Sequence, residues 1–396
     1  MKILFCTPCF LDSFAPGLKR TMLLAEGITA ETTHQTIVYG FGSLTDAQTL
    51  QAKYKNTIVR HFSKQKYTKR SYCNAQRIVR SAANFYQSEL NNIISEDQID
   101  IIIVYSVSFA LYEPIINIAK SRGIKIISDA GEFFDFSIKR LLNGVLFNQW
   151  LFYKRQIPLV DGAIFPAAKW GRRLYDLGVP SIFIPGVIDA SEFDTESSAE
   201  KKRSDAINLV IMGALTKREC IPLILKAVEK ISEIEGNFRV HFFGFDLRDK
   251  VSRANYNRLK KINERFNNIH CHGKVSEETK KVLLDQADFF MLLRDDIDEN
   301  NFIFPFRLGE YMSHAKPIIV SSIESFKSII PEDCVFFTDN SEKDIVGCIS
   351  TILNRKEYAR GIGVRGKSWA HTYLNYKTLS SRLDSFLSYI LCNETS

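Results

Sequence analysis

The residues with the clearest chemical potential lie in one run of the sequence, Arg294 to Ser321. Within it, Arg307, Glu310 and His314 are three and four residues apart, so a helix would present them on one face. Pro305 suits the first position of that helix, and the free amide groups behind it attract an anion such as a diphosphate. The run therefore predicts a site that binds an anion and hydroxyl groups.

Two short apolar segments are expected to position this site. Residues 287–293 are bounded by charged residues, which is typical of a buried parallel strand, and this strand would end at Arg294. Residues 207–212 predict another strand, which ends at Gly213, where the missing side chain lets a ligand approach the backbone. Ligands bind at the carboxyl ends of strands in open α/β sheets, so both ends should line the site.

Basic residues follow two of the predicted strands. Lys217 and Arg218 come soon after the strand 207–212 and offer charge to phosphate oxygens, although an ordinary solvated loop explains them equally well. In the first half, Gly17 is followed by Lys19 and Arg20 at an expected helix start. Neither half holds a G-x-G-x-x-G or a Walker lysine motif, which argues against nicotinamide and P-loop chemistry.

The composition bounds the class of protein. The chain has 396 residues, 45% of them apolar, and a net charge of +7, so it can bury a large core and is expected to form two domains. Its longest apolar runs are shorter than the ~20 residues that a membrane span needs, and residues 1–10 predict a strand rather than a signal peptide. We therefore expect a cytoplasmic protein. The mild positive charge fits anionic small molecules, an anionic membrane or nucleic acid.

Cysteine and histidine residues are the candidate metal ligands of this chain. The eight cysteines have no repeating spacing, which fits reduced thiols. Cys6 and Cys9 form an isolated C-x-x-C, so a redox or metal role is the weaker alternative for them. His270 and His272 would share one face of a strand, but no third and fourth ligand can be named. We expect no metal centre.

Strand-like and amphipathic segments alternate along the chain, which predicts a doubly wound α/β protein. The expected strands are 2–6, 35–39, 101–105, 125–128, 162–165, 181–184, 207–212, 239–243, 269–271, 288–293, 317–320 and 334–337. Residues 190–206 are polar and indicate a linker. We therefore predict an N-terminal domain over 1–189 and a C-terminal domain over 207–367, with a helix in 368–396 that returns to the first.

Several stretches resemble the donor domain of a retaining nucleotide-sugar glycosyltransferase of the GT-B fold, glycosyltransferase family 4. They are a glycine-then-basic loop, a strand that ends in glycine, a G-x-V-S loop, and a run of proline, basic residue, glutamate-tyrosine and K-P-I-I. In chain order these are residues 213–219, 242–245, 273–276 and 305–319. Residues 185–189 (PGVID) are similar to the family's segment before its interdomain linker. The resemblance implies two Rossmann-like doubly wound domains that face a cleft.

The resemblance also implies roles for the matching residues. Glu310 would accept hydrogen bonds from the ribose hydroxyls of the donor. Arg218 would replace the lysine that grips the diphosphate, or Lys217 could do so, and cations there would stabilise the charge that grows on the leaving phosphate. The expected donor site consists of Gly17, Gly213, Lys217, Arg218, Gly244, Val275, Arg294, Pro305, Arg307 and Glu310.

Two departures from the family pattern concern catalysis. Many relatives place a first glutamate eight positions before the second, and here that position is Phe302. The family's acceptor-side histidine is not evident, and Asp129 and Glu132 occupy the corresponding turn. Glu132 is the expected contact of the transferred sugar or acceptor, although a surface or capping carboxylate is an equal alternative. Together with Asp129 and Glu310 it forms the expected catalytic set.

Two stretches in the first half bear on the acceptor. Residues 64–80 interleave basic residues with tyrosines, and residues 138–155 set Leu, Phe and Trp between basic ends. An ordinary surface or core helix explains either one alone, whereas together they suggest a face that rests on an anionic bilayer. A nucleic-acid interface would need a stacking platform that the alternating pattern does not offer.

The function expected from the resemblance is the transfer of a sugar, with retention, from a nucleotide-diphosphate donor to a lipid-linked or cell-envelope polysaccharide acceptor. The enzyme would work without a metal or other cofactor, in the cytoplasm and at the inner face of the membrane. The alternative is a non-catalytic sugar-nucleotide-binding relative, which Phe302 makes plausible.

Overall fold

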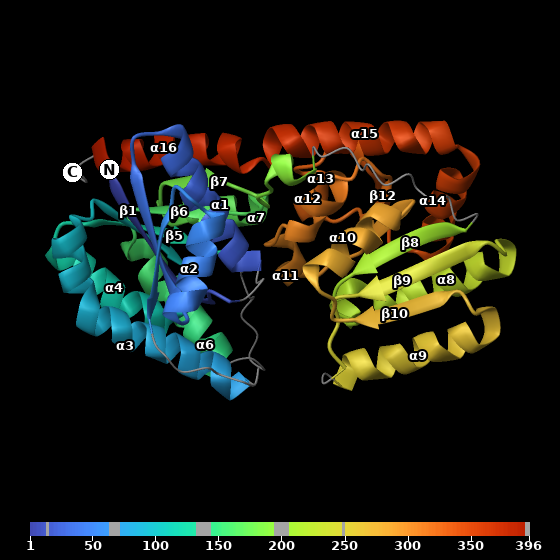
Figure 1. Ribbon diagram of the computed structural model, residues 1–396, viewed down its shortest axis with the longest axis horizontal. Helices are drawn as coiled ribbons and strands as arrows, with labels where there is room; N and C mark the ends of the chain where they lie inside the picture. The colour runs from blue at the N-terminus through green and yellow to red at the C-terminus, as the bar shows by residue number, and fades with distance from the viewer. Residues whose placement is uncertain (13–15, 63–71, 132–143, 194–205, 248–249, 393–396) are drawn as a thin grey trace. The chain divides into compact units, whose positions relative to one another are not determined.

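The computed structural model describes residues 1–12, 16–62, 72–131, 144–193, 206–247 and 250–392, without the side chains of 72–76, 144–146 and 298–299. It divides into two compact units (Figure 1). Unit 1 comprises Met1–Ile188 and Leu374–Ser396, and unit 2 comprises Asp189–Tyr373. Each unit is built around its own parallel sheet.

Unit 1 has a seven-stranded sheet in the order β3-β2-β1-β4-β5-β6-β7, with every neighbouring pair parallel. Its strands are β1 (Lys2–Phe10), β2 (Gln35–Phe41), β3 (Ile58–Phe62), β4 (Ile101–Tyr105), β5 (Lys125–Asp129), β6 (Gly162–Phe165) and β7 (Ser181–Phe183). Its helices are α1 (Pro16–Glu31), α2 (Leu44–Lys53), α3 (Tyr72–Asp97), α4 (Phe109–Ser121), α6 (Gly144–Leu151), α7 (Ala168–Asp176) and α16 (Tyr376–Cys392). The four apolar residues that begin β4 are fully or almost fully buried, as a central strand covered on both faces requires.

The last helix, α16, belongs to the core of unit 1 although unit 2 separates it from the rest in sequence. Leu379, Leu383 and Leu387 of α16 are completely buried in one cluster with residues of α1 and β1. Burial of each leucine contributes about 1.5–3 kcal/mol. An isolated bridge between Ile188 and Asn375 joins the two points at which the chain leaves unit 1 and returns to it.

Unit 2 has a six-stranded parallel sheet in the order β10-β9-β8-β11-β12-β13. Its strands are β8 (Ile207–Met212), β9 (Phe238–Phe243), β10 (Ile269–Gly273), β11 (Phe289–Leu292), β12 (Ile318–Ser321) and β13 (Phe336–Thr338). Its helices are α8 (Ile221–Ile234), α9 (Lys250–Phe266), α10 (Glu277–Gln286), α11 (Asp298–Asn301), α12 (Phe306–Met312), α13 (Glu324–Lys327), α14 (Glu342–Asn354) and α15 (Lys356–Tyr373). Apolar residues of α8 and α14 pack together on one face of this sheet.

The prediction of a doubly wound α/β protein with two sheets is confirmed. All twelve expected strands overlap observed ones, and β3 is the one strand of the described chain that was not predicted. The polar stretch 190–206 begins with a short 3-10 turn, Ala190–Phe193, and its residues 194–205 lie outside the described ones. The segment 368–396 includes the end of α15, which belongs to unit 2, and α16, which belongs to unit 1.

Candidate functional site

The candidate site lies in unit 2, where the strand order reverses. β8 and β11 are neighbours at the centre of the sheet, and the chain continues from them toward opposite edges. It passes through Gly213 directly after β8 and reaches Arg294 shortly after β11. Both residues are thus at the carboxyl edge of the sheet, at the switch point where open α/β folds bind ligands.

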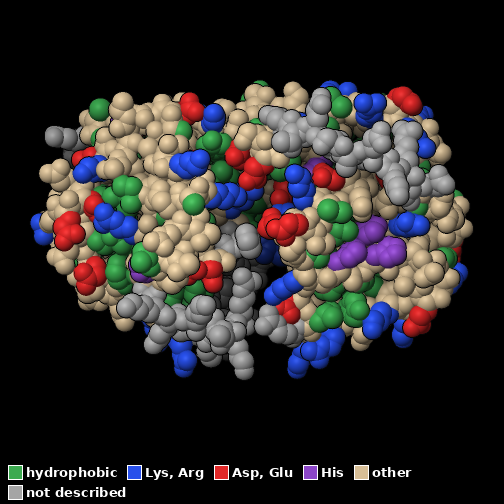
Figure 2. Space-filling model, viewed as in Figure 1, with side chains coloured by type: hydrophobic (Ala, Val, Ile, Leu, Met, Phe, Trp, Pro, Cys, Tyr) green, Lys and Arg blue, Asp and Glu red, His purple; other side chains and the backbone are tan. Residues whose placement is uncertain are grey.

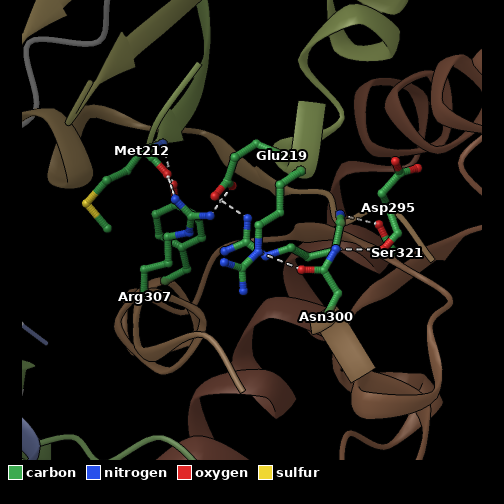
Figure 3. A network of polar contacts seen from close by, with 9 residues as sticks. Met212, Glu219, Asp295, Asn300, Arg307 and Ser321 are labelled. Atoms are coloured by element: carbon green, nitrogen blue, oxygen red, sulfur yellow. Dashed lines mark hydrogen bonds and ion pairs between the residues drawn. The ribbon is translucent and has the colours of Figure 1, made fainter. Parts of the chain in front are cut away.

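One carboxylate, that of Glu219, is shared by two arginines at this edge (Figure 3). Its Oε1 pairs with Nη1 of Arg294, and its Oε2 accepts a hydrogen bond from Nη2 of Arg307. The side chains of Glu219, Arg294 and Arg307 are 16%, 11% and 14% exposed. Burial disfavours the charged carboxylate, but Arg307 and Arg294 outweigh it and hold the pKa of Glu219 below its ordinary value. Burial and Arg307 lower the pKa of Arg294 to about 10, so it stays charged at neutral pH.

Glu219 was not among the residues predicted for the site. A signal was nevertheless present, because an acidic residue directly follows Lys217 and Arg218 in a loop that was expected to bind phosphate. Such a carboxylate would repel an anion unless nearby cations held it. The two arginines that hold it come from distant parts of the sequence, so the loop alone does not reveal the arrangement.

Arg218 and Lys217 have different surroundings. Both belong to the short 3-10 turn Lys217–Glu219. Nε of Arg218 donates to Oδ1 of Asn300 at 2.8 Å, and Nδ2 of Asn300 donates to the carbonyl of Asp295 at 2.7 Å. Lys217 is exposed. Arg218 also helps to lower the pKa of Arg294, so Arg218, Arg294 and Arg307 form one arginine group, whereas Lys217 stays exposed.

The backbone of Arg294 is fixed by two polar side chains. Its N–H donates to the hydroxyl of Ser321, at the end of β12, at 2.7 Å. That hydroxyl donates to Oδ1 of Asn340 at 2.7 Å, and Nδ2 of Asn340 donates to the carbonyl of Arg294 at 2.8 Å. This closed set of hydrogen bonds holds the start of the loop after β11 in one position.

Helix α12 is attached to the end of β8 by two of its side chains. The N–H of Met212 donates to the hydroxyl of Tyr311 at 2.6 Å, and Nη1 of Arg307 donates to the carbonyl of the same residue. The Tyr311 ring stacks on Phe290 with centroids 4.3 Å apart. Pro305 lies at the N-cap, one position before the helix begins, and the helix has only seven residues. The side chain of Arg307, rather than the helix end, therefore supplies the ordered positive charge.

Glu310 of α12 and His314, two residues beyond the end of α12, both contact helix α10. Oε1 of Glu310 pairs with Nζ of Lys280 at 2.5 Å, and these side chains are 18% and 20% exposed. Nδ1 of His314 lies 3.3 Å from a carboxylate oxygen of Asp285. Burial, with nearby lysines, lowers the pKa of His314 to about 3, so this histidine is neutral. The three residues expected on one helix face thus have separate partners.

Gly244 lies beside Gly213, and Val275 belongs to the loop that follows β10. Both glycines have a positive φ, +84° at Gly244 and +144° at Gly213. A β-carbon on Gly244 would lie 3.3 Å from the backbone N of Gly213. The N–H of Gly244 donates to the carbonyl of Gly273 at 2.6 Å. Val275 is half-buried. These two predicted residues therefore border the next strand ends, β9 and β10.

The predicted residues of unit 1 form a buried group. Nε of Arg20 donates to Oδ2 of Asp129 at 2.8 Å, and its Nη atoms donate to the carbonyls of Ile184 and Pro185. Arg20 is 1% and Asp129 2% exposed. Gly17, in the first turn of α1, is so close to the ring of Tyr105 that a β-carbon there would collide with it. Asp129 therefore holds α1 to the end of β5, and Glu132 lies outside the described residues.

Phe302, which stands where a glutamate was expected, is completely buried. It directly follows α11 and lies in the apolar interior of unit 2. Its side chain fills the core, so this position offers no group that could accept a proton or a hydrogen bond.

The candidate metal ligands of the sequence are histidines of unit 2 and the Cys6 and Cys9 pair of unit 1. His241, His270 and His272 gather over β9 and β10 in a surface patch (Figure 2), with Nδ1 of His241 3.1 Å from Nε2 of His272. Burial raises the pKa of Cys6 to about 12 and also raises that of Cys9, so neither is a thiolate at neutral pH. Among the described residues, no group of three or more His, Cys, Asp or Glu side chains could hold a metal ion.

Within the segments that the structure describes, no helix is both long enough and apolar enough to cross a bilayer.

Comparison with known proteins gives one family match. Residues 192–369 match the family model of Glycosyl transferases group 1. This range includes all of the arginine group and Glu310. A comparison with curated protein sequences found no match.

Solved structures similar to this chain share its whole length at low identity. A glycosyltransferase from Rickettsia africae has a TM-score of 0.73 at 13% identity, with 99% of each chain covered. Sucrose-phosphate synthase from Thermosynechococcus elongatus has a TM-score of 0.74 at 11% identity, again with 99% of each covered. Anabaena HepE in complex with UDP has a TM-score of 0.70 at 13% identity, over 98% of this chain and 100% of that one. The chain therefore has the two-domain GT-B fold.

Proposed function

We propose that this chain is a glycosyltransferase that moves a sugar from a nucleotide-diphosphate donor to an acceptor hydroxyl. The premise is the match of residues 192–369 to Glycosyl transferases group 1. The observation that supports it best is the group of Arg218, Arg294 and Arg307 at the carboxyl ends of β8 and β11. Each charge-assisted hydrogen bond from such a group to a phosphate oxygen contributes roughly 1.5–3 kcal/mol.

The arginines would act on the leaving group. In the proposed step the acceptor oxygen bonds to the anomeric carbon while the bond from that carbon to the diphosphate oxygen breaks. The electron pair of the broken bond stays on the diphosphate, and the hydroxyl proton passes to the departing phosphate. The positive charge of Arg218, Arg294 and Arg307 would stabilise this growing negative charge. Because side chains supply that charge, we propose a reaction that needs no metal and, as in family 4, retains the configuration of the sugar.

The remaining donor contacts are proposed from the same geometry. Glu310 would accept hydrogen bonds from ribose hydroxyls with the carboxylate oxygen that Lys280 does not hold. Gly213 and Gly244 would let Arg307 and the two strand ends pack closely beside the diphosphate, and Val275 would lie on the nucleoside side. Relatives of this fold have been solved with UDP and with UDP-glucose, so uridine nucleotides are the first to test.

We propose that unit 1 binds a lipid-linked or cell-envelope saccharide acceptor at the inner face of the membrane. The exposed ring of Phe147 stacks on Trp150 in α6, with centroids 5.8 Å apart, and the exposed residues Lys154 and Arg155 follow. An aromatic pair beside basic residues suits an anionic bilayer surface. Glu132 would contact the acceptor or the transferred sugar. Co-sedimentation with anionic liposomes that weakens at high salt is expected, and equal recovery in the supernatant with and without lipid would contradict it.

Thermal unfolding with UDP, GDP and ADP tests the proposed function. At least one nucleotide should raise the melting temperature by about 2–5 °C at saturating concentration. Arg218→Ala should remove this shift, and Arg258→Ala, an exposed arginine on α9, should keep it. No response of the wild type to any nucleotide would overturn the proposal. Hydrolysis or transfer of the sugar then separates an enzyme from a non-catalytic sugar-nucleotide-binding relative.

A further inference from the structure

The arginine group, Arg218, Arg294 and Arg307, includes a carboxylate, that of Glu219, which the binding of an anion does not require. The two oxygens of Glu219 are divided between Arg294 and Arg307. Its single negative charge therefore offsets one of the two positive charges of this pair. Arg218 has a neutral side-chain partner, Asn300. Asp296 accepts a hydrogen bond from Asn301, and no ion pair joins it to the described arginines. The four side chains of Arg218, Arg294, Arg307 and Glu219 together carry a net charge of two positive units.

This net charge matches one ligand of the proposed reaction better than the other. The diphosphate of a nucleotide sugar has one ionisable oxygen on each phosphate and carries two negative charges. When the sugar leaves, the terminal phosphate gains a second ionisable oxygen with a pKa near 6, so the free nucleoside diphosphate carries close to three negative charges at pH 7.5. Without Glu219, the three arginines would match the product.

We infer that Glu219 is a specificity-determining residue that weakens the binding of the nucleoside diphosphate relative to the nucleotide sugar and so promotes product release. The inference rests on the proposed donor site. Glu219 does this as a fixed internal anion: it lies within the arginine group, is mostly buried, and stays ionised because Arg307 and Arg294 outweigh the effect of its burial. A third negative charge on the ligand therefore meets a carboxylate where it would otherwise meet unpaired arginine.

Binding of UDP and UDP-glucose to the full chain, measured by calorimetry at pH 7.5, tests this role. Glu219→Gln keeps the shape and removes the charge, so the ratio of UDP affinity to UDP-glucose affinity should rise about five- to tenfold. Glu219→Asp keeps the charge and should leave the ratio close to that of the wild type. GDP and ADP, each with its glucose conjugate, replace the uridine pair if the wild type prefers them.

Two further variants separate charge from packing. Arg294→Gln leaves one net positive charge and should shift the ratio the other way, toward the nucleotide sugar. The double variant Glu219→Gln with Arg294→Gln restores two net charges and should restore the wild-type ratio. These variants also keep the test valid if Glu219→Gln alone does not fold.

The outcomes distinguish this inference from the function on which it rests. If the wild type binds none of the nucleotides, the proposed function fails and this inference with it. If the wild type binds but the ratio moves neither in folded Glu219→Gln nor in Arg294→Gln, Glu219 has no role in discrimination and the inference alone is overturned. Opposite shifts in the two single variants support it.

Discussion

The guanidinium group of Arg307 lies directly against the α-carbon of Gly213, so closely that a β-carbon at that position would collide with Nη1. The same guanidinium donates to the carbonyl of Met212 and to Glu219. The glycine after β8 is therefore required by an arginine of α12, in addition to any approach of a ligand. Its φ of +144° is a second reason, because side chains rarely adopt it.

Gly213→Ala should displace Arg307 and weaken nucleotide binding at least about tenfold, with a loss of about 1–3 kcal/mol of stability from the strained backbone. Gly236→Ala is the matched control, since a β-carbon there meets nothing within 4 Å. Calorimetric titration and chemical unfolding measure the two effects. Wild-type affinity in a folded Gly213→Ala protein would show that the position of Arg307 does not matter for the ligand.

Glu310→Gln should reduce discrimination between UDP and 2′,3′-dideoxy-UDP by about tenfold, because a charged acceptor for ribose hydroxyls is lost. Glu277→Gln is a suitable control, because Glu277 also approaches Lys280, at 3.5 Å, but is 50% exposed. Affinities of each variant for the two nucleotides give the ratio. Equal loss of affinity for both would indicate that Glu310 acts only by holding Lys280.

Asp129→Asn should cost about 3–5 kcal/mol of stability, because it leaves the buried guanidinium of Arg20 without its counter-charge. Glu89→Gln, an exposed change on α3, should stay within about 0.5 kcal/mol. Urea unfolding of the full-length variants measures both changes in stability. A variant with unchanged stability and no transferase activity would instead place Asp129 in the catalytic set.

The histidine patch of unit 2 should make stability depend on pH. Burial and the neighbours His270, His272 and Arg239 lower the pKa of His241 from 6.5 to about 4, and the pKa values of His270 and His272 are lowered as well. The unfolded chain therefore binds more protons than the folded one between these values. This contribution to stability is complete above pH 6.5 and is lost as the pH falls toward 4.

For His241 the loss should be about 1–2 kcal/mol, since partial exposure screens the interaction. His241→Gln should flatten the dependence of the unfolding free energy on pH over this range, and Arg258→Gln, an exposed change on α9, should leave the curve parallel to that of the wild type. The slope should not vanish, because the lowered pKa of His314 acts in the same direction. An identical slope in His241→Gln would contradict the assignment.

The strands could be predicted from sequence because most are short runs of apolar, β-branched residues, such as Ile101–Val104. β3 was not predicted because Arg60 and His61 interrupt its apolar residues, which an edge strand tolerates. Edge position is a property of the assembled sheet, and a local pattern does not contain it.

The site could be predicted in part for a similar reason. Gly213, Arg294 and Arg307 were recognised because each follows or begins a segment with a clear pattern. The partners of these residues were not, because the pairing of Glu219 with Arg307 joins residues 88 positions apart. Lys280, the partner of Glu310, likewise comes from a different helix. Such pairs depend on how the elements pack.

The return of α16 to unit 1 has a consequence for the order in which the protein folds during synthesis. Unit 2 is one continuous stretch of chain, whereas the core of unit 1 lacks Leu379, Leu383 and Leu387 until all of unit 2 has been made. Unit 2 can therefore complete its core on the ribosome while the face of α1 that α16 covers is still open. That apolar face is the surface on which a chaperone would have most to protect in the nascent chain.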